Sequence, residues 1–122
     1  MRLIVTPRLL LRPFTLNDLE PYHTRITSDP DVMRYIGASG APLTLVETQA
    51  RIEKMIAGLD ADGFGMLAVI ARKEKRLIGR CGICYLDGTP EVELGYLFEK
   101  QYWGKGYATE AAQACMRYGF ME

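Results

Sequence analysis

Residues 91–110 of this 122-residue chain read EVELGYLFEKQYWGKGYATE. In residues 91–99 apolar and other side chains alternate with a period of two, which predicts a β-strand. Residues 106–120 carry small and apolar side chains at helical spacing, which predicts a helix packed closely on a sheet. This stripe consists of Ala108, Ala111, Ala112, Cys115, Met116 and Gly119. The predicted order is therefore a strand, the loop Gln101-Tyr102-Trp103-Gly104-Lys105-Gly106, and a helix.

This order of elements favours an anion-binding site. N–H groups without partners converge at the start of a helix, and the helix dipole favours negative charge there. Gly104 and Gly106 allow the backbone to approach a phosphate without an intervening Cβ atom, and Lys105 adds a positive charge. The six-residue pattern alone is weak evidence, because chance produces it in roughly one chain of this length in ten. A glycine turn that only opens a helix is the alternative.

Two other phosphate-binding motifs fit the sequence less well. A Walker loop requires Gly-x4-Gly-Lys-Ser/Thr, which the sequence lacks. A dinucleotide fingerprint requires a third small residue after Gly104-x-Gly106, but Thr109 occupies that position and no parallel β-α-β unit follows. Nucleotide binding is therefore disfavoured.

The N-terminal third of the chain predicts a strand followed by two helices. Residues 8–14 form an apolar run that a proline closes, which is typical of a strand. Thr15 and Asp18 are spaced as a box-like cap for a helix at residues 16–26. Pro30 occupies the first position of a second, short helix.

The middle of the chain predicts a long helix and a hairpin. Thr44 and Glu47 form a capping box for a helix that we expect to end at Gly58. Residues 64–71 and 76–86 are β-rich runs joined by a charged turn, which predicts a hairpin. Together with the strand predicted at residues 91–99, these elements predict an α+β fold: a mostly antiparallel sheet of about four strands with helices on both faces.

The composition is typical of a soluble globular protein with one domain. Apolar residues make up 48% of the chain and charged residues 25%. Fifteen Lys and Arg residues balance fifteen Asp and Glu residues, so no general field attracts nucleic acid. No apolar run approaches about 18 residues, and the N-terminal residues lack a secretory apolar segment, so we expect no membrane partner. The expected location is the cytoplasm.

The three cysteines, Cys81, Cys84 and Cys115, suit a reducing compartment better than a disulfide framework. The spacing of Cys81 and Cys84 is typical of metal and redox sites, but both lie in a predicted strand. Residues i and i+3 of a strand point to opposite faces, so the two sulfur atoms cannot converge. We predict packed thiols and no bound metal.

The order of elements, with Gln-x-x-Gly-x-Gly in the loop, resembles the GNAT superfamily of acyltransferases that use acetyl-coenzyme A (acetyl-CoA). Further agreement comes from residues 6–13 (TPRLLLRP), residues 29–37 (DPDVMRYIG) and the segment Glu93-Leu94-Gly95-Tyr96. These blocks look like the branch that acetylates N-terminal alanine or serine α-amines of ribosomal proteins, whose relatives act on small amines. The resemblance spans nearly the whole chain. It implies transfer of an acetyl group from acetyl-CoA, the donor substrate, to a primary amine.

The resemblance also implies a role for each residue of the loop and of the strand before it. Backbone N–H groups of the loop would hold the coenzyme A pyrophosphate, and the strand would pair with the pantetheine arm. A backbone N–H near Tyr96 or Leu97 would contact the thioester oxygen, where losing one such donor costs about 10²–10³ in rate. The implied coenzyme-binding residues are Leu97, Phe98, Gln101, Tyr102, Trp103, Gly104, Lys105, Gly106, Ala108 and Thr109.

The same strand supplies a candidate general base. Glu91, Glu93, Gly95 and Leu97 share one face, and Val92, Leu94, Tyr96 and Phe98 share the other. Because a covered strand would not normally carry carboxylates, we expect the Glu93 face to open into a cleft, with Gly95 leaving space beside it. Glu93 is the candidate base, directly or through a water, and Tyr96 is the second predicted catalytic residue. The alternative is that the carboxylates only face solvent.

Three other positions bear on function. Arg34 and Tyr35 match the place where the family's acceptor groove begins, so the resemblance implies that they contact the acceptor amine. His23 has no nearby Ser, Cys or acidic partner in the sequence, so we expect an ordinary surface or packed side chain. Tyr102 and Trp103 are expected to anchor the turn rather than to stack on a base.

The family's domain continues beyond the glycine-loop helix with a strand, a helix and a hairpin, whereas this sequence ends at Glu122. Those elements usually carry a tyrosine that protonates the coenzyme A thiolate and one wall of the acceptor site. Two hypotheses follow. One is an N-acetyltransferase, and the other is a non-catalytic module that binds coenzyme A or forms a homodimer through the open edge of the strand at residues 91–99.

Overall fold

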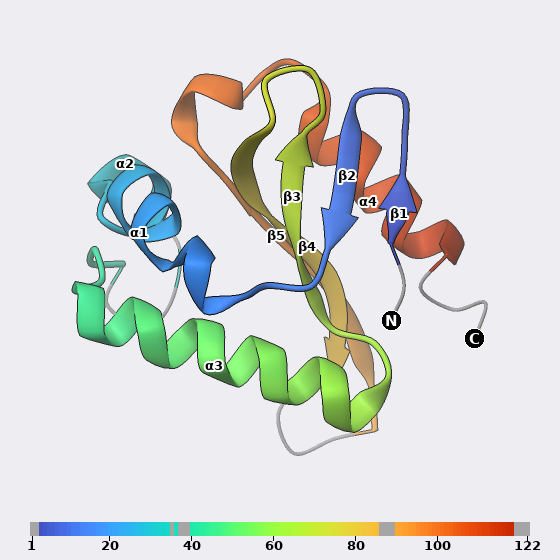
Figure 1. The fold of residues 1–122 in the computed structure, drawn as a ribbon, viewed down its shortest axis with the longest axis horizontal. Coiled ribbons are helices and arrows are strands. Elements are labelled where there is room, and N and C mark those ends of the chain that lie inside the picture. The colour runs from blue at the N-terminus through green and yellow to red at the C-terminus, as the bar shows by residue number, and fades with distance from the viewer. Residues whose placement is uncertain (1–2, 35, 37–39, 86–89, 119–122) are drawn as a thin grey trace.

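The computed structural model describes residues 3–34, 36, 40–85 and 90–118 (Figure 1). Within these residues, five antiparallel strands form one sheet in the order β1-β2-β3-β4-β5. The strands are β1 (Ile4–Val5), β2 (Leu9–Arg12), β3 (Met66–Ala71), β4 (Arg76–Tyr85) and β5 (Val92–Phe98). The expectation of about four strands missed β1. Two residues are too few to show an alternating pattern, and β1 exists because it pairs with β2.

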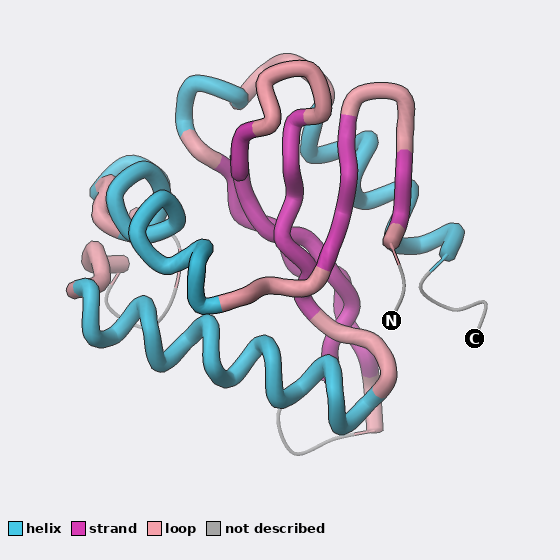
Figure 2. Tube along the Cα trace, in the orientation of Figure 1, coloured by secondary structure: helices cyan, strands magenta, loops and turns pink. Residues whose placement is uncertain are grey.

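In the described part of the chain, four α-helices accompany the sheet: α1 (Leu19–Tyr22), α2 (Pro30–Met33), α3 (Leu45–Asp62) and α4 (Tyr107–Tyr118). Three short helical segments of other hydrogen-bonding types join them: η1 (Leu16–Asp18), η2 (His23–Thr27) and η3 (Lys100–Tyr102). In Figures 1 and 2, α4 crosses one face of the sheet, and α1, α2 and α3 lie on the other. The α+β fold with helices on both faces is therefore confirmed.

Two apolar clusters fill these two interfaces. One contains Val69 and Cys81 of the sheet with Ala111 of α4. The other contains Leu97 of β5 with Ile52 of α3 and further side chains from α1 and α2. Phe98 of β5 belongs to the first cluster and Leu97 to the second, so these successive residues contribute to opposite layers, as the alternation predicts.

The helix predicted at residues 16–26 is a series of three helical segments, η1, α1 and η2. The predicted cap is present, since the Thr15 N–H donates to Asp18 Oδ2 at 2.9 Å. The short helix α2 begins at Pro30, as predicted, and the Asp29 side chain accepts a hydrogen bond from the Asp31 N–H at 2.8 Å.

Helix α3 begins after its predicted capping box but ends later than predicted. Thr44 and Glu47 exchange both hydrogen bonds of the box. The helix then continues through Gly58 and ends at Asp62, followed by Gly63 with a φ of 77°. An interior glycine costs only about 1 kcal/mol relative to alanine, so the packing of α3 on the sheet outweighs it. The left-handed Gly63 is the true end signal.

The predicted stripe on α4 is partly wrong. Ala111 and Cys115 are buried, but Ala114 takes the remaining buried position and Met116 is 53% exposed. Cys115 meets Cys81 of β4, with the two Sγ atoms 3.6 Å apart in the core. Gly119 lies outside the described residues.

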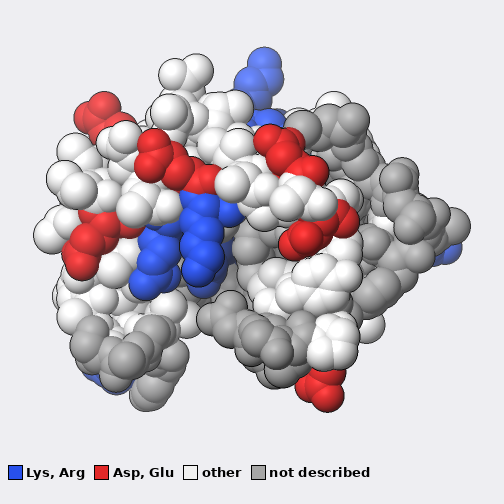
Figure 3. Space-filling view, turned by 90° about the horizontal axis from the view of Figure 1, so that it is seen from below, with Lys and Arg blue, Asp and Glu red and all other residues white. Residues whose placement is uncertain are grey.

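The surface carries charges of both signs. Figure 3 shows the face seen from below relative to Figure 1, where Lys and Arg side chains gather in the middle and Asp and Glu side chains surround them. This mixture agrees with the zero net charge of the sequence. Within the part of the chain that the structure describes, no helix combines the length and hydrophobicity that a membrane crossing requires.

Candidate functional site

The loop at residues 101–106, called the glycine loop below, joins β5 to α4 through η3. Gly104 has a φ of 74° and Gly106 a φ of 81°. Residues with a Cβ atom rarely adopt this left-handed backbone conformation, so both positions favour glycine. Outside the helices and strands, the N–H groups of residues 104–109 donate no hydrogen bond to a backbone carbonyl of the described residues, and the first N–H groups of a helix have no intrahelical partner. Those N–H groups therefore remain available to a ligand.

Two side chains fix the glycine loop in place. Trp103 Nε1 donates to the Phe98 carbonyl oxygen at 2.9 Å, which ties the loop to the end of β5. Arg8 Nη1 donates to the Lys105 carbonyl oxygen at 2.9 Å from the other side. Trp103 thus acts as an anchor of the turn, as the sequence predicted.

Arg8 also links the β1–β2 turn to the first turn of α4. Its Nε lies 2.6 Å from Glu110 Oε1, its backbone N–H donates to Glu110 Oε2 at 3.0 Å, and its guanidinium covers the Tyr107 ring at 4.1 Å. Thr6 Oγ1 donates a further hydrogen bond to Glu110. Burial raises the pKa of the Glu110 carboxyl, but the hydrogen bonds from Thr6 and Arg8 outweigh it and hold the pKa below its ordinary value.

This arrangement, called the Glu110 tether below, went unrecognised in the sequence. Thr6 and Arg8 lie in a block that matched the family, but more than 90 residues separate them from Glu110. Sequence spacing therefore gave no signal for the contact.

A pocket of about 430 Å³, the donor pocket, opens between the edge of β5, the glycine loop and the start of α4. Its lining consists of Tyr96, Leu97, Phe98, Tyr102, Trp103, Gly104, Gly106, Tyr107, Ala108 and Thr109. Most of the residues that the resemblance implies for coenzyme binding thus surround one pocket. Gln101 and Lys105 do not line it, and Tyr107 lines it without having been predicted.

Gln101 and Lys105 point elsewhere. Gln101 Nε2 donates to Glu99 Oε2, and the Gln101 side chain lines a different groove. Lys105 Nζ lies 5.9 Å from the centre of the Tyr102 ring. Chemically, the donor pocket therefore offers backbone N–H groups and aromatic surface, rather than a charged side chain, to a ligand.

Strand β5 pairs with β4, and the sheet order gives it no second neighbour among the described strands. The register with β4 is continuous, and the Glu99 N–H just beyond β5 donates to the Ile78 carbonyl oxygen at 2.8 Å. N–H groups alternate in direction along an antiparallel pair. The Leu97 N–H therefore faces β4, while the Tyr96 N–H faces the open edge beside the donor pocket.

The two predicted catalytic residues differ in their surroundings. Tyr96 is 53% exposed and lines the donor pocket. Glu93 is exposed on the other face of β5 and lines neither the donor pocket nor the groove that contains Gln101. The space expected beside Gly95 is filled, because a Cβ atom there would lie 2.7 Å from Met66 Cε.

Of the predicted acceptor contacts, Arg34 directly follows α2, and its Nη2 lies 3.7 Å from Asp31 Oδ1 in an ion pair. It lines neither cavity, and Tyr35 lies outside the described residues. His23 has a structural contact, since its Nε2 lies 3.1 Å from the Leu43 carbonyl oxygen and joins η2 to the segment before α3.

Comparison with known proteins agrees with this geometry. Residues 8–122 match the acetyltransferase (GNAT) domain. The chain belongs to the GNAT family. An uncharacterized GNAT relative, the N-acetyltransferase YnaD of Bacillus subtilis strain 168, is 36% identical over 119 residues, which cover 98% of this chain and 66% of YnaD. The chain spans about two thirds of the length of the curated relatives it matches.

Solved GNAT structures have the same fold. A GNAT-family acetyltransferase from Bacillus anthracis is 36% identical and superposes with a TM-score of 0.80, covering 99% of this chain and 68% of that one. RimL, a ribosomal L7/L12 α-N-protein acetyltransferase solved in complex with coenzyme A, has a TM-score of 0.76 at 17% identity, covering 95% and 66% of the two chains. At that identity the likeness concerns the fold alone.

Proposed function

We propose that this GNAT protein transfers the acetyl group of acetyl-CoA to a primary amine. The observation that carries the proposal is the donor pocket, where an open strand edge, two left-handed glycines and the start of α4 meet. The GNAT family uses acetyl-CoA, and the name of YnaD describes an N-acetyltransferase. The RimL structure holds coenzyme A on the same fold.

The donor would lie along the edge of β5. Its pyrophosphate would accept hydrogen bonds from the free N–H groups of the glycine loop and the first turn of α4, where the helix dipole also favours an anion. Its pantetheine amides would pair with the outward N–H and C=O groups of β5. Trp103 already occupies the Phe98 carbonyl oxygen, so pairing would begin nearer to Tyr96.

The direction of the N–H groups favours Tyr96 over Leu97 as the proposed oxyanion donor. The Tyr96 N–H faces the open edge, whereas the Leu97 N–H faces β4, so Tyr96 is the residue whose backbone can reach the thioester oxygen. In the reaction, the amine nitrogen attacks the carbonyl carbon, a C–N bond forms, and negative charge develops on that oxygen. The C–S bond then breaks and coenzyme A leaves as a thiolate, while the nitrogen loses a proton.

The acceptor must be a neutral amine before it can attack. With ordinary pKa values of about 7.7–8.0 for an α-amine and 10.4 for lysine, roughly one α-amine in eight but only one lysine in about 2,500 is neutral at pH 7. An α-amine therefore needs less help from a base. We assign proton removal to Glu93, directly or through a water, and acceptor contacts to Arg34 and Tyr35. A protein N-terminus or a small α-amine is the acceptor class that this chemistry favours.

The test is turnover of acetyl-CoA with a panel of amines, including peptides with N-terminal alanine or serine, a small amine and an Nα-blocked lysine peptide. We expect acetylated product with α-amines at pH 7 and much less with lysine. If acetyl-CoA binds but no amine is acetylated, the non-catalytic alternative replaces the proposal. In that case solution mass measured at rising concentration would show whether β5 pairs two copies.

A further inference from the structure

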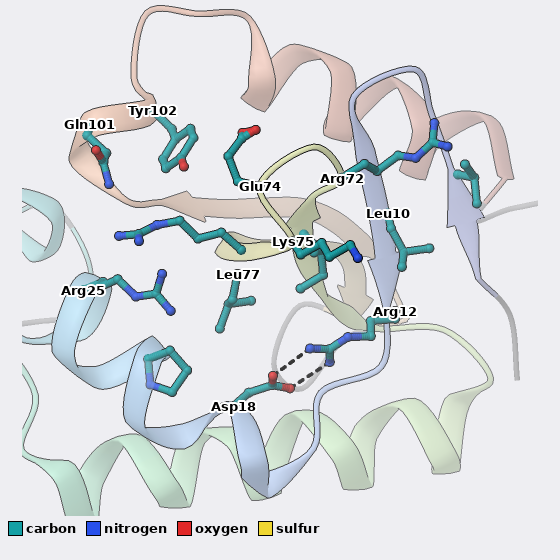
Figure 4. A pocket seen from close by; sticks show the side chains of 14 residues that line it. Leu10, Arg12, Asp18, Arg25, Arg72, Glu74, Lys75, Leu77, Gln101 and Tyr102 are labelled. Carbon is teal, nitrogen blue, oxygen red and sulfur yellow. Dashed lines mark hydrogen bonds and ion pairs between the residues drawn. The ribbon is translucent and has the colours of Figure 1, made fainter.

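A second cavity, the basic groove, adjoins the donor pocket at Tyr102, which lines both. Its volume is about 1,020 Å³, and β2, the segment from η1 to η2, the β3–β4 turn and η3 contribute to it (Figure 4). Among its lining residues are Arg12, Arg25, Lys75, Arg76, Leu77 and Tyr102. Figure 4 shows Arg12, Arg25 and Lys75 arranged around Leu77.

Carboxylates already neutralise two of these cations. Arg12 donates to both oxygens of Asp18, at 2.8 and 2.9 Å, and this pairing helps to hold the pKa of Asp18 below its ordinary value despite burial, which raises it. Arg76 donates to both oxygens of Glu99, at 3.2 and 2.8 Å. These pairs fix the walls of the groove and leave little net charge of their own.

Arg25, unlike Arg12 and Arg76, is not paired with a carboxylate in the described part of the chain. The half-buried Arg25 guanidinium makes no hydrogen bond or ion pair with any residue in the described ranges. Burial and the nearby Arg76 lower its pKa, while Glu99 and Tyr102 partly oppose that effect. A guanidinium that lacks a partner, is partly desolvated and lies beside a second cation is stabilised by an added anion.

The remaining charges of the groove favour an anion as well. Arg72 Nη1 donates to the Thr6 carbonyl oxygen at 2.8 Å, and because this partner is neutral it does not offset the positive charge. Lys75 is exposed at the turn, and Glu74, unlike Asp18, forms no ion pair with another residue of the described ranges. Arg25, Arg72 and Lys75 therefore outnumber Glu74.

We propose that the basic groove binds a phosphomonoester dianion. A guanidinium presents two parallel N–H groups that match two phosphate oxygens, and an ammonium group adds a point charge. Arg25 is the central contact, Lys75 the second cation and the Tyr102 hydroxyl an additional donor. The phosphomonoester could belong to a free small molecule or to the 3′-phosphate of coenzyme A, since Tyr102 lines both cavities.

The first test uses inorganic phosphate and does not depend on acetyl transfer. Arginine Nε–Hε signals are followed by NMR during a phosphate titration at constant ionic strength, with Arg25→Gln and Lys75→Gln as variants and the exposed Arg51→Gln of α3 as the matched control. We expect the Arg25 signal to shift, and phosphate to bind about tenfold more weakly to the Arg25 variant, the loss typical of one charge-assisted hydrogen bond. Melting temperatures without phosphate show whether each variant folds.

Two results would each overturn the proposal. One is the absence of a phosphate-dependent shift of the Arg25 signal in the folded protein, and the other is equal phosphate affinity in the Arg25 variant, the Arg51 variant and wild type. A second arm identifies the source by comparing coenzyme A with 3′-dephospho-coenzyme A. Weaker binding of coenzyme A alone to Arg25→Gln would assign the groove to the coenzyme's own phosphate. If both coenzyme forms bind the variant normally while phosphate does not, the groove serves a separate small molecule.

Discussion

Glu93 and Tyr96 lie three residues apart on β5, but the strand places them on opposite faces. The Tyr96 backbone N–H faces the open edge beside the donor pocket, and proline is the one substitution that removes this group. The Glu93 carboxylate is exposed on the other face, where an acceptor could approach. The two residues can therefore be tested separately.

Substituting Glu93 by Gln should lower kcat by about 10²–10⁴, the usual contribution of a general base, because the acceptor then loses its proton only to solvent. KM for acetyl-CoA should stay unchanged, since Glu93 lies outside the donor pocket. Steady-state kinetics with an α-amine peptide measure both constants. Glu91→Gln, an exposed carboxylate two residues away, is the control, and unchanged turnover in Glu93→Gln would remove this role.

Gly106 and Gly58 give a matched pair of glycine substitutions. Gly106→Ala should reduce the free energy of unfolding by about 1–2 kcal/mol, because Gly106 has a φ of 81° and a Cβ atom there would meet Arg8 Nη2 at 3.3 Å. Gly58→Ala should increase it by about 0.5–1 kcal/mol, since the position is helical and open. Urea unfolding measures both. Equal effects of the two variants would show that the conformation of the glycine loop is not the one described.

At the scale of elements, the sequence predicts what local patterns encode. Thr44 and Glu47 have the spacing of a capping box, and the two strands of the hairpin show a clear strand pattern. The structure contains both the capping box and the hairpin. The prediction that α3 ends at Gly58 was wrong, because packing on the sheet outweighs the small cost of an interior glycine. Long-range contacts left no local pattern, so neither the Glu110 tether nor the pairing of Cys81 with Cys115 could be predicted.

The Glu110 tether makes stability depend on pH. Its carboxyl pKa is lower in the folded protein than the ordinary 4.5, so the tether contributes fully above that value and its contribution is lost as the pH falls through the folded pKa. At pH 7 wild type should be more stable than Glu110→Gln by about 1–2 kcal/mol. The difference in the free energy of unfolding between the two proteins should shrink to zero as the pH drops below 4.5. Urea unfolding of both proteins across this range measures it, and a difference that is constant with pH would contradict the tether.

At the scale of the whole molecule, the described residues form two cavities with different chemistry, and Tyr102 lines both of them. The donor pocket presents backbone N–H groups at the start of α4, and the basic groove presents guanidinium groups. The net charge of the chain is zero, so attraction of an anion has to come from these local arrangements rather than from a general field. The central claim is that the donor pocket binds acetyl-CoA.

The most direct test is the thermal shift that acetyl-CoA causes in wild type, Gly104→Asn and Gly104→Asp. A Cβ atom at Gly104 meets no atom within 4 Å, and Asn tolerates a left-handed φ as well as Asp does, so the two variants differ chiefly in charge. Ligand at 100 times its Kd should stabilise wild type by about 2.7 kcal/mol, or roughly 10 °C. We predict that Gly104→Asn keeps more of this shift than Gly104→Asp, which should lose it. No shift in folded wild type, or the same shift in all three proteins, would contradict the account.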